Sequence, residues 1–196
     1  MTDCNLYGYG LFFVHRSFRA IKAFNAEAKP SAVFQDTDVA KWLEAVAYSL
    51  AVEPDEHLSY LADKTINLIG RAQCEDGYLN TYFTIKDPSK RWTNLKEGHE
   101  LYTAGHMTEA AVAYYKATGK TEFLDIMKKF ADLICRTFGP EEGQNHGYPG
   151  HQEIELALIR LYHVTGNKKY LETAKYFIDR RGVGENYFLE EERTGI

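Results

Sequence analysis

Two kinds of apolar pattern alternate along this chain, and each extends over the length of one helix. In residues 38–51 apolar side chains occur on almost every side of a helix, as Val39, Trp42 and Val46 illustrate. In residues 56–73 they return every three or four positions, with charged residues between them. A helix that is apolar all round is buried, whereas one with a single apolar stripe lies on a surface. The sequence therefore predicts a buried helix followed by a surface helix.

The same pair of helices is predicted twice more. Buried helices are expected at about 99–118 and 151–165, and amphipathic helices at about 121–137 and 168–181. The segments YKATGK (115–120) and YHVTGN (162–167) match at an offset of 47 residues, and Phe130 and Phe177 keep the same offset. An internal repeat of this kind is typical of stacked helical hairpins.

Two further elements complete the prediction. A first helix is expected at about 12–28, before Lys29 and Pro30 end it. Residues 77–85 follow an Asp-Gly turn signal and are rich in Tyr, Thr and Phe, so we predict a short β-like excursion there.

These patterns predict an all-α fold, either an α/α toroid or a solenoid of hairpins. In both, the inner helices run parallel, so their N-termini meet at one end. The long loops at 30–37, 73–98 and 139–150 all enter that end, which is where we expect a site. We predict a single domain over residues 1–196, with an N-terminal segment at 1–11 of unassigned structure and a C-terminal tail at 183–196.

Composition excludes several classes of partner. The net charge is −5 and no long run of Lys or Arg occurs, which argues against nucleic acid and anionic membranes. No apolar run approaches the ~20 residues of a membrane span, and the N-terminus does not resemble an export signal. Cys4, Cys74 and Cys135 are odd in number and form no CxxC pair, so neither a disulfide framework nor a cysteine zinc site is indicated. Reduced thiols point to the cytoplasm.

Polar side chains stand where each buried helix is predicted to begin. These residues are Gln35, Asp36 and Asp38, then His99 and Glu100, then His151 and Gln152. Each set has a second interpretation. Asp36 and Asp38 could provide acid/base carboxylates or form an N-cap pair, and His151 could line a pocket or bond within the core.

The segment His99-Glu100-Leu101-Tyr102-Thr103 begins like an HExxH zinc motif. Thr103 replaces the second histidine, so this is not that metal site. Tyr102 and His106 share a helical face with His99, and we interpret His106 as a pocket residue or as a buried, hydrogen-bonded histidine.

Two aromatic residues near the predicted site, Trp92 and Tyr78, could stack on a sugar ring. Core packing is the alternative for each of them.

Five segments together resemble a known family. They are VFQDTDVAKWLEA (33–45), DGYLNTYF (76–83), RWTNL (91–95), HELYTAGH (99–106) and GYPGHQEIELAL (147–158). In order and wording they resemble the N-terminal part of the catalytic domain of glycoside hydrolase family 127, the β-L-arabinofuranosidases.

This resemblance implies an (α/α)6 barrel that hydrolyses a terminal L-arabinofuranoside or a related sugar. It also implies a zinc-bound cysteine nucleophile and a glutamate acid/base, in Glu-x-Cys and Cys-Cys motifs. This chain has neither motif, so we expect no catalytic residue, no metal ligand and no cofactor in it, with zinc confined to the complete family domain. The sugar-binding residues carried over are His99 and His151, with Gln35, Asp36 and Asp38 as weaker matches and Gln152, Tyr102 and Trp92 as neighbours.

Three good inner helices are predicted where the family barrel has six. We therefore expect about half of a barrel, a carbohydrate ligand, the missing C-terminal half as a partner, and no hydrolysis by this chain alone. The alternative is a non-catalytic hairpin module that binds a carbohydrate or a protein.

Overall fold

The computed structural model describes residues 32–194, and these residues are largely helical. The predicted helix at 12–28 and the segment at 1–11 lie outside this range. The elements in chain order are α2 (Asp36–Val52), α3 (Glu56–Ala72), α4 (Thr81–Lys86), the 3-10 turn η1 (Pro88–Lys90), α5 (Glu100–Thr118), α6 (Glu122–Thr137), α7 (Ile154–Thr165), α8 (Lys168–Arg180) and α9 (Tyr187–Thr194).

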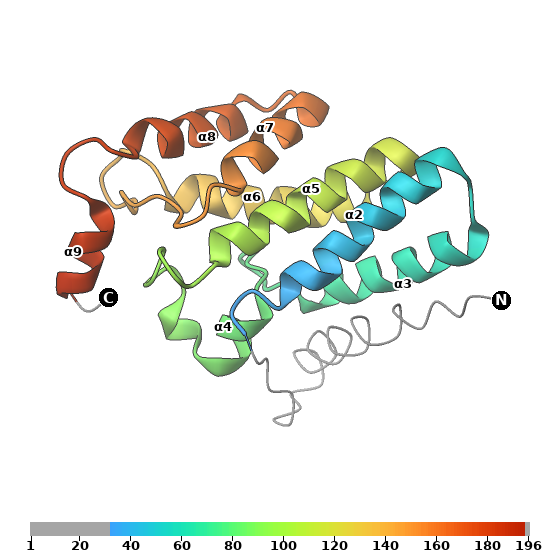
Figure 1. Ribbon diagram of the computed structural model, residues 1–196, viewed down its shortest axis with the longest axis horizontal. Helices are drawn as coiled ribbons and strands as arrows, with labels where there is room; N and C mark the ends of the chain where they lie inside the picture. Colours follow the sequence, from blue (N-terminus) through green and yellow to red (C-terminus); the bar gives the residue numbers. More distant parts are fainter. Residues whose placement is uncertain (1–31, 195–196) are drawn as a thin grey trace.

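The long helices form two layers of hairpins (Figure 1). Helices α2, α5 and α7 run in the same direction and pack side by side, while α3, α6 and α8 return in the opposite direction. The first set is the inner layer and the second the outer layer, as the alternating apolar patterns predicted. The arrangement is consistent with about half of an α/α toroid.

The repeat seen in the sequence corresponds to two equivalent turns. Helices α5 and α7 end at Gly119 and Gly166, whose φ angles are 74° and 69°. Each glycine N–H donates to the carbonyl oxygen four residues earlier, at 2.8 and 2.7 Å. Only a residue without a Cβ adopts this left-handed cap at little cost, so the Thr-Gly pair ends both inner helices in the same way.

The core lies between the two layers. Phe130 of α6 and Phe177 of α8, which are related by the repeat, are both fully buried. The Tyr114 hydroxyl of α5 donates to Asp63 Oδ1 of α3 at 2.7 Å, which joins the second hairpin to the first. Burial of these large side chains is the main favourable contribution to folding.

The β-like excursion predicted near 77–85 is wrong. Residues 78–80 have no regular structure, and the chain then forms helix α4. The Asn80 side chain accepts a hydrogen bond from the Phe83 N–H at 3.1 Å and so caps this helix. Within residues 32–194 no strand is present with which this segment could pair; the one isolated bridge joins Phe138 and Asn145.

Two predicted helix starts also differ from the structure. Helix α2 begins at Asp36, preceded by Gln35, so Asp36 is not the N-cap residue. Helix α7 begins at Ile154 rather than at His151. A Cβ on Gly105 of α5 would lie 3.0 Å from the Ile154 nitrogen, so the turn before α7 packs directly on α5 and the helix starts beyond that contact.

The segment assigned to a C-terminal tail contains helix α9. Its Glu191 side chain is buried and accepts hydrogen bonds from the N–H groups of Leu95 and Lys96, at 2.5 and 3.3 Å. Helix α9 therefore supports the loop that leads into α5. Among the described helices, none combines the length and the apolar character needed to cross a membrane.

Candidate functional site

The first residues of α2, α5 and α7 lie at the same end of the inner layer (Figure 1). The loops that precede α5 and α7 carry His99 and His151 to this end. Their ring centroids are 4.5 Å apart. The Tyr102 ring lies 5.7 Å from His99 and 5.3 Å from His151. His99, His151 and Tyr102 therefore lie together at this end of the inner layer.

Contact between the two loops explains why the histidines meet. The Gly150 N–H donates to the Leu95 carbonyl at 2.9 Å. A Cβ on Gly150 would lie 2.2 Å from the Lys96 carbonyl oxygen, so only glycine permits this approach. The residue after Gly150 is His151, which the contact places beside His99.

The backbone of His99 is left-handed, with φ at 56° and ψ at 17°. This conformation is uncommon for a residue with a Cβ and is found disproportionately at functional sites. The His99 ring also lies against the Glu97 carbonyl through Nδ1. A carbonyl oxygen accepts only, so Nδ1 carries the proton and Nε2 is an acceptor in the neutral ring.

The other predicted site residues are placed differently. Gln35 is half-buried, while Asp38 and Gln152 are exposed. Asp36 is buried and accepts hydrogen bonds from the Thr81 N–H and hydroxyl at 2.7 and 2.6 Å. Both carboxylate oxygens are thus used to tie α2 to the start of α4, and burial raises the pKa of Asp36 to about 6.

Trp92 and Tyr78 pack with the core aromatics, which favours the core interpretation for both. The Trp92 ring lies 5.3 Å from Tyr78, 6.2 Å from Phe130 and 5.3 Å from Phe138. The φ of Trp92 is 62°. Sequence reasoning had no signal for this left-handed residue.

Glu100 fixes these aromatic residues at the start of α5. Its carboxylate accepts from the Tyr78 hydroxyl and, at 2.8 Å, from the Trp92 N–H. Burial raises the pKa of Glu100 to about 7, although both hydrogen bonds act in the opposite direction. This carboxylate is therefore bonded to the core aromatic residues and is not directed toward the two histidines.

A row of polar side chains continues from Tyr102 along the inner layer. Tyr102, His106 and Glu109 follow one another on a single face of α5, and the Tyr102 and His106 ring centroids are 4.5 Å apart. His106 Nδ1 lies 3.3 Å from Glu153 Oε1. Burial, followed by the charge of Lys41, lowers the pKa of His106.

Glu109 and Glu153 are not among the predicted sugar-binding residues. Burial and the nearby Glu109 carboxylate raise the pKa of Glu153. Arg160 of α7 lies 2.9 Å from Glu109 and 3.6 Å from Glu44 of α2. The available sequence signal was the polar spacing of residues 102, 106 and 109 within an otherwise apolar helix.

One group of described side chains could hold a metal ion. Ligand atoms of His106, Glu109 and Glu153 all lie within 4.8 Å of one another. The two described cysteines lie elsewhere: Cys74 Sγ accepts from Arg91 Nη2 at 3.2 Å, and Cys135 is on α6 of the outer layer. Residues 32–194 therefore do not fit the cysteine-ligated zinc that the family resemblance implies.

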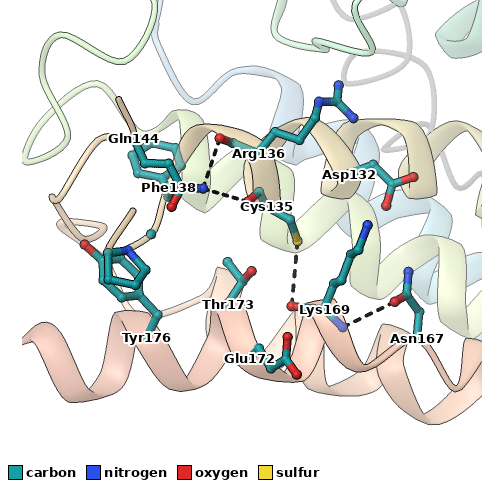
Figure 2. A pocket seen from close by; sticks show the side chains of 12 residues that line it. Asp132, Cys135, Arg136, Phe138, Gln144, Asn167, Lys169, Glu172, Thr173 and Tyr176 are labelled. Atoms are coloured by element: carbon teal, nitrogen blue, oxygen red, sulfur yellow. Dashed lines mark hydrogen bonds between the residues drawn. The ribbon is translucent and has the colours of Figure 1, made fainter. Parts of the chain in front are cut away.

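A cavity of about 610 Å³ opens between α6 and α8 (Figure 2), and its lining residues include neither His99 nor His151. Cys135 lies on its wall, with Sγ 3.9 Å from the Lys169 carbonyl. Burial raises the pKa of this thiol. A protonated thiol in the outer layer does not serve as a nucleophile for the inner site.

A family model of the GH127 catalytic domain of β-L-arabinofuranosidases matches residues 9–195. The non-reducing end β-L-arabinofuranosidase of Bifidobacterium longum subsp. longum is 48% identical over 163 residues, which make up 81% of this chain and 25% of that protein.

Two solved structures are also similar. A GH127 β-L-arabinofuranosidase from Geobacillus stearothermophilus T6 has a TM-score of 0.90 and 57% identity, covering 93% of this chain and 29% of that one. A further GH127 β-arabinofuranosidase has a TM-score of 0.84 and 40% identity, covering 89% of this chain and 29% of that one. The chain thus spans less than a third of the length of each of these relatives, and it belongs to the GH127 family of β-L-arabinofuranosidase catalytic domains.

Proposed function

We propose that this chain forms part of the sugar-binding wall of a family 127 glycoside hydrolase and binds a terminal L-arabinofuranoside or a related sugar. The observation that carries this proposal is the meeting of His99, His151 and Tyr102 at the end where the inner helices begin. The names of the relatives, which are β-L-arabinofuranosidases, support the class of sugar.

The chemistry of these three side chains suits a small polyhydroxylated ligand. The neutral His151 ring offers one donor and one acceptor, the His99 ring offers its Nε2 acceptor, and a sugar hydroxyl both donates and accepts. His151 is exposed, while His99 and Tyr102 are half-buried. Lys41 Nζ lies 3.5 Å from the Tyr102 hydroxyl and orients it.

Hydrolysis requires groups that residues 32–194 do not bring to this end. A retaining glycosidase holds a nucleophile and an acid/base about 5 Å apart across the scissile bond. Cys74 lies beside Arg91 and Cys135 lies in the outer layer. We therefore propose that the chain alone is inactive, and that the C-terminal half of the barrel is its partner and provides the nucleophile, the acid/base and the zinc.

The proposed location is the cytoplasm. Cys74 and Cys135 are both free, and reduced thiols are the usual state there.

Calorimetric titration of the 196-residue chain with L-arabinose tests the sugar site. We expect weak, saturable binding that His99→Ala and His151→Ala each abolish. The matched control is His163→Ala, which should bind as the parent does. His163 is exposed and lies near the other end of α7. Saturable binding that survives both site variants would place the sugar elsewhere.

A chromogenic aryl β-L-arabinofuranoside tests the missing catalytic groups. We expect no turnover by the purified chain. Turnover that depends on Asp36 or Glu100 would show that this chain carries its own catalytic carboxylate.

The second candidate function is that of a non-catalytic binding module. The lack of Glu-x-Cys and Cys-Cys motifs in this chain favours it. Finding such motifs in the downstream reading frame would reject it.

A further inference from the structure

Near the two histidines, three side chains from α5 and from the turn before α7 lie close together. His106 and Glu109 are separated by one turn of α5, and Glu153 stands immediately before α7. One candidate ligand atom from each lies within 4.8 Å of the other two. A divalent ion bound at about 2.0–2.2 Å to an imidazole nitrogen and carboxylate oxygens needs ligand atoms no more than about 4.4 Å apart, so small side-chain rotations would bring these three atoms into range.

The hydrogen-bonding state of the carboxylates is the second observation. The Glu109 side chain is 8% exposed and that of Glu153 is 14% exposed. No hydrogen bond reaches Glu109 Oε1 or Glu153 Oε1, although Arg160 Nη1 and His106 Nδ1 lie 2.9 and 3.3 Å away. Buried carboxylate oxygens without a well-aligned donor are unfavourable, so a bound cation would stabilise this group.

Fewer basic than acidic side chains surround the group formed by His106, Glu109 and Glu153. Arg160 lies between Glu109 and Glu44 and is shared by both. Lys41 lies toward Tyr102, where it also disfavours a charge on His106. In the cation-bound state Glu109 and Glu153 are ionised, so Glu153, whose pKa burial and Glu109 raise, loses its proton on binding. Together with Glu44, these carboxylates leave one negative charge against Arg160 and Lys41, and that charge attracts the cation.

We propose that His106, Glu109 and Glu153 bind one divalent cation. One imidazole with two carboxylates is a ligand set that suits Zn²⁺ or Mn²⁺. No thiol takes part, so this site is distinct from a cysteine zinc centre, and it would replace the expectation that the chain has no metal ligand. The ion would connect α5 to the turn before α7 and so hold His151 in place, since the Glu153 N–H donates to the His151 carbonyl at 3.0 Å.

Titration of the chelator-treated, full 196-residue chain with Zn²⁺ and with Mn²⁺ tests the site. We expect one equivalent to bind and the melting temperature to rise with cation concentration, because an ion that binds only the folded state stabilises it. His106→Gln and Glu109→Gln should each weaken binding at least tenfold. His163→Gln and Cys135→Ser are matched controls and should bind as the parent does.

Substitution with Co²⁺ gives a readout that does not depend on stability. The proposed ligands predict visible absorption bands without a thiolate charge-transfer band in the near ultraviolet. A thiolate band, or binding that both His106→Gln and Glu109→Gln leave unchanged, would overturn the assignment. So would the absence of saturable binding by parent protein whose circular dichroism shows the native helical content. The cation titration is scored on variants of His106 and Glu109 and the sugar titration on variants of His99 and His151, so failure of sugar binding would leave the cation assignment unaffected.

Discussion

At the scale of single residues, three buried carboxylates hold the long segment between α3 and α5. Asp36 of α2 accepts from the Thr81 N–H, Glu100 of α5 from the Trp92 N–H, and Glu191 of α9 from the Leu95 N–H. Each acid belongs to a different helix. A buried carboxylate is stable only when hydrogen-bonded, so the acids and the segment stabilise one another. This segment leads directly to His99.

Glu100→Gln should remove a pH dependence of stability. Burial raises the pKa of Glu100 from 4.5 to about 7, so between these values the folded protein holds a proton that the unfolded chain has lost. The stability that Glu100 contributes is therefore present below pH 4.5 and is lost as the pH rises through about 7.

Urea denaturation at the two ends of this range measures the effect. Relative to the variant, the free energy of unfolding of the parent should fall by on the order of 3 kcal/mol from about pH 4.5 to about pH 7.5. Equal changes in the two proteins would show that Glu100 does not titrate in this range.

His99→Gly should leave the protein more stable than His99→Ala by about 1 kcal/mol. The φ of His99 is 56°, a conformation that disfavours a Cβ but not glycine. Both variants lose the imidazole ring, so their difference in the free energy of unfolding reports the backbone alone. Equal stabilities would indicate that residue 99 does not have a left-handed backbone.

At the scale of elements, the site depends on how closely α5 approaches the start of α7. A Cβ on Gly105 would lie 2.6 Å from Glu153 Cγ and 3.0 Å from the Ile154 nitrogen. Backbone atoms cannot move aside as the end of a side chain can. The small residue at 105 therefore sets the distance between two inner helices and, through it, the position of His151.

Gly105→Ala should destabilise the protein by roughly 1–3 kcal/mol through overpacking. Gly70→Ala on α3 is the matched control, because its Cβ would meet only side-chain atoms of Ile126, Cδ1 at 2.9 Å and Cγ1 at 3.4 Å. That flexible end can rotate away, and alanine also favours a helix by about 1 kcal/mol over glycine. Denaturation curves of both variants decide the point, and a Gly105→Ala protein no less stable than Gly70→Ala would contradict the close contact.

At the scale of the whole molecule, the described residues form three stacked hairpins whose inner helices are parallel (Figure 1). The N-termini of these inner helices lie at one end, next to the two loops that carry His99 and His151. Of the two cysteines within residues 32–194, Cys74 lies beside Arg91 and Cys135 lies on α6 of the outer layer. Because the chain spans 25% of the Bifidobacterium relative, activity is a property to be tested in a complete domain.

A chimera provides that test. Replacing the matching segment of the Bifidobacterium protein with this chain should give an enzyme that hydrolyses a chromogenic β-L-arabinofuranoside. In the chimera, His151→Ala should lower kcat/KM by about ten- to hundredfold through lost hydrogen bonds, and His163→Ala should not. A folded chimera in which His151→Ala is as active as its parent would remove His151 from the sugar site.

The sequence by itself determined the six long helices, α2, α3 and α5 to α8, and the hairpin repeat, because these depend on local periodicity and on Thr-Gly stops at residues 119 and 166. The buried or amphipathic character of each helix predicted its layer, and parallel inner helices predicted that His99 and His151 would meet. All of these follow from short-range patterns that one chain carries in its own order of residues.

The tertiary structure alone decided which polar residues face one another. The β-like pattern at 77–85 became helix α4 because no strand within the described residues pairs with it, while Asn80 and Asp36 offered a helix start. The group of His106, Glu109 and Glu153 forms because α7 packs onto Gly105. Contacts between distant segments depend on differences of a few tenths of an ångström in packing distance. Helical periodicity does not encode such differences.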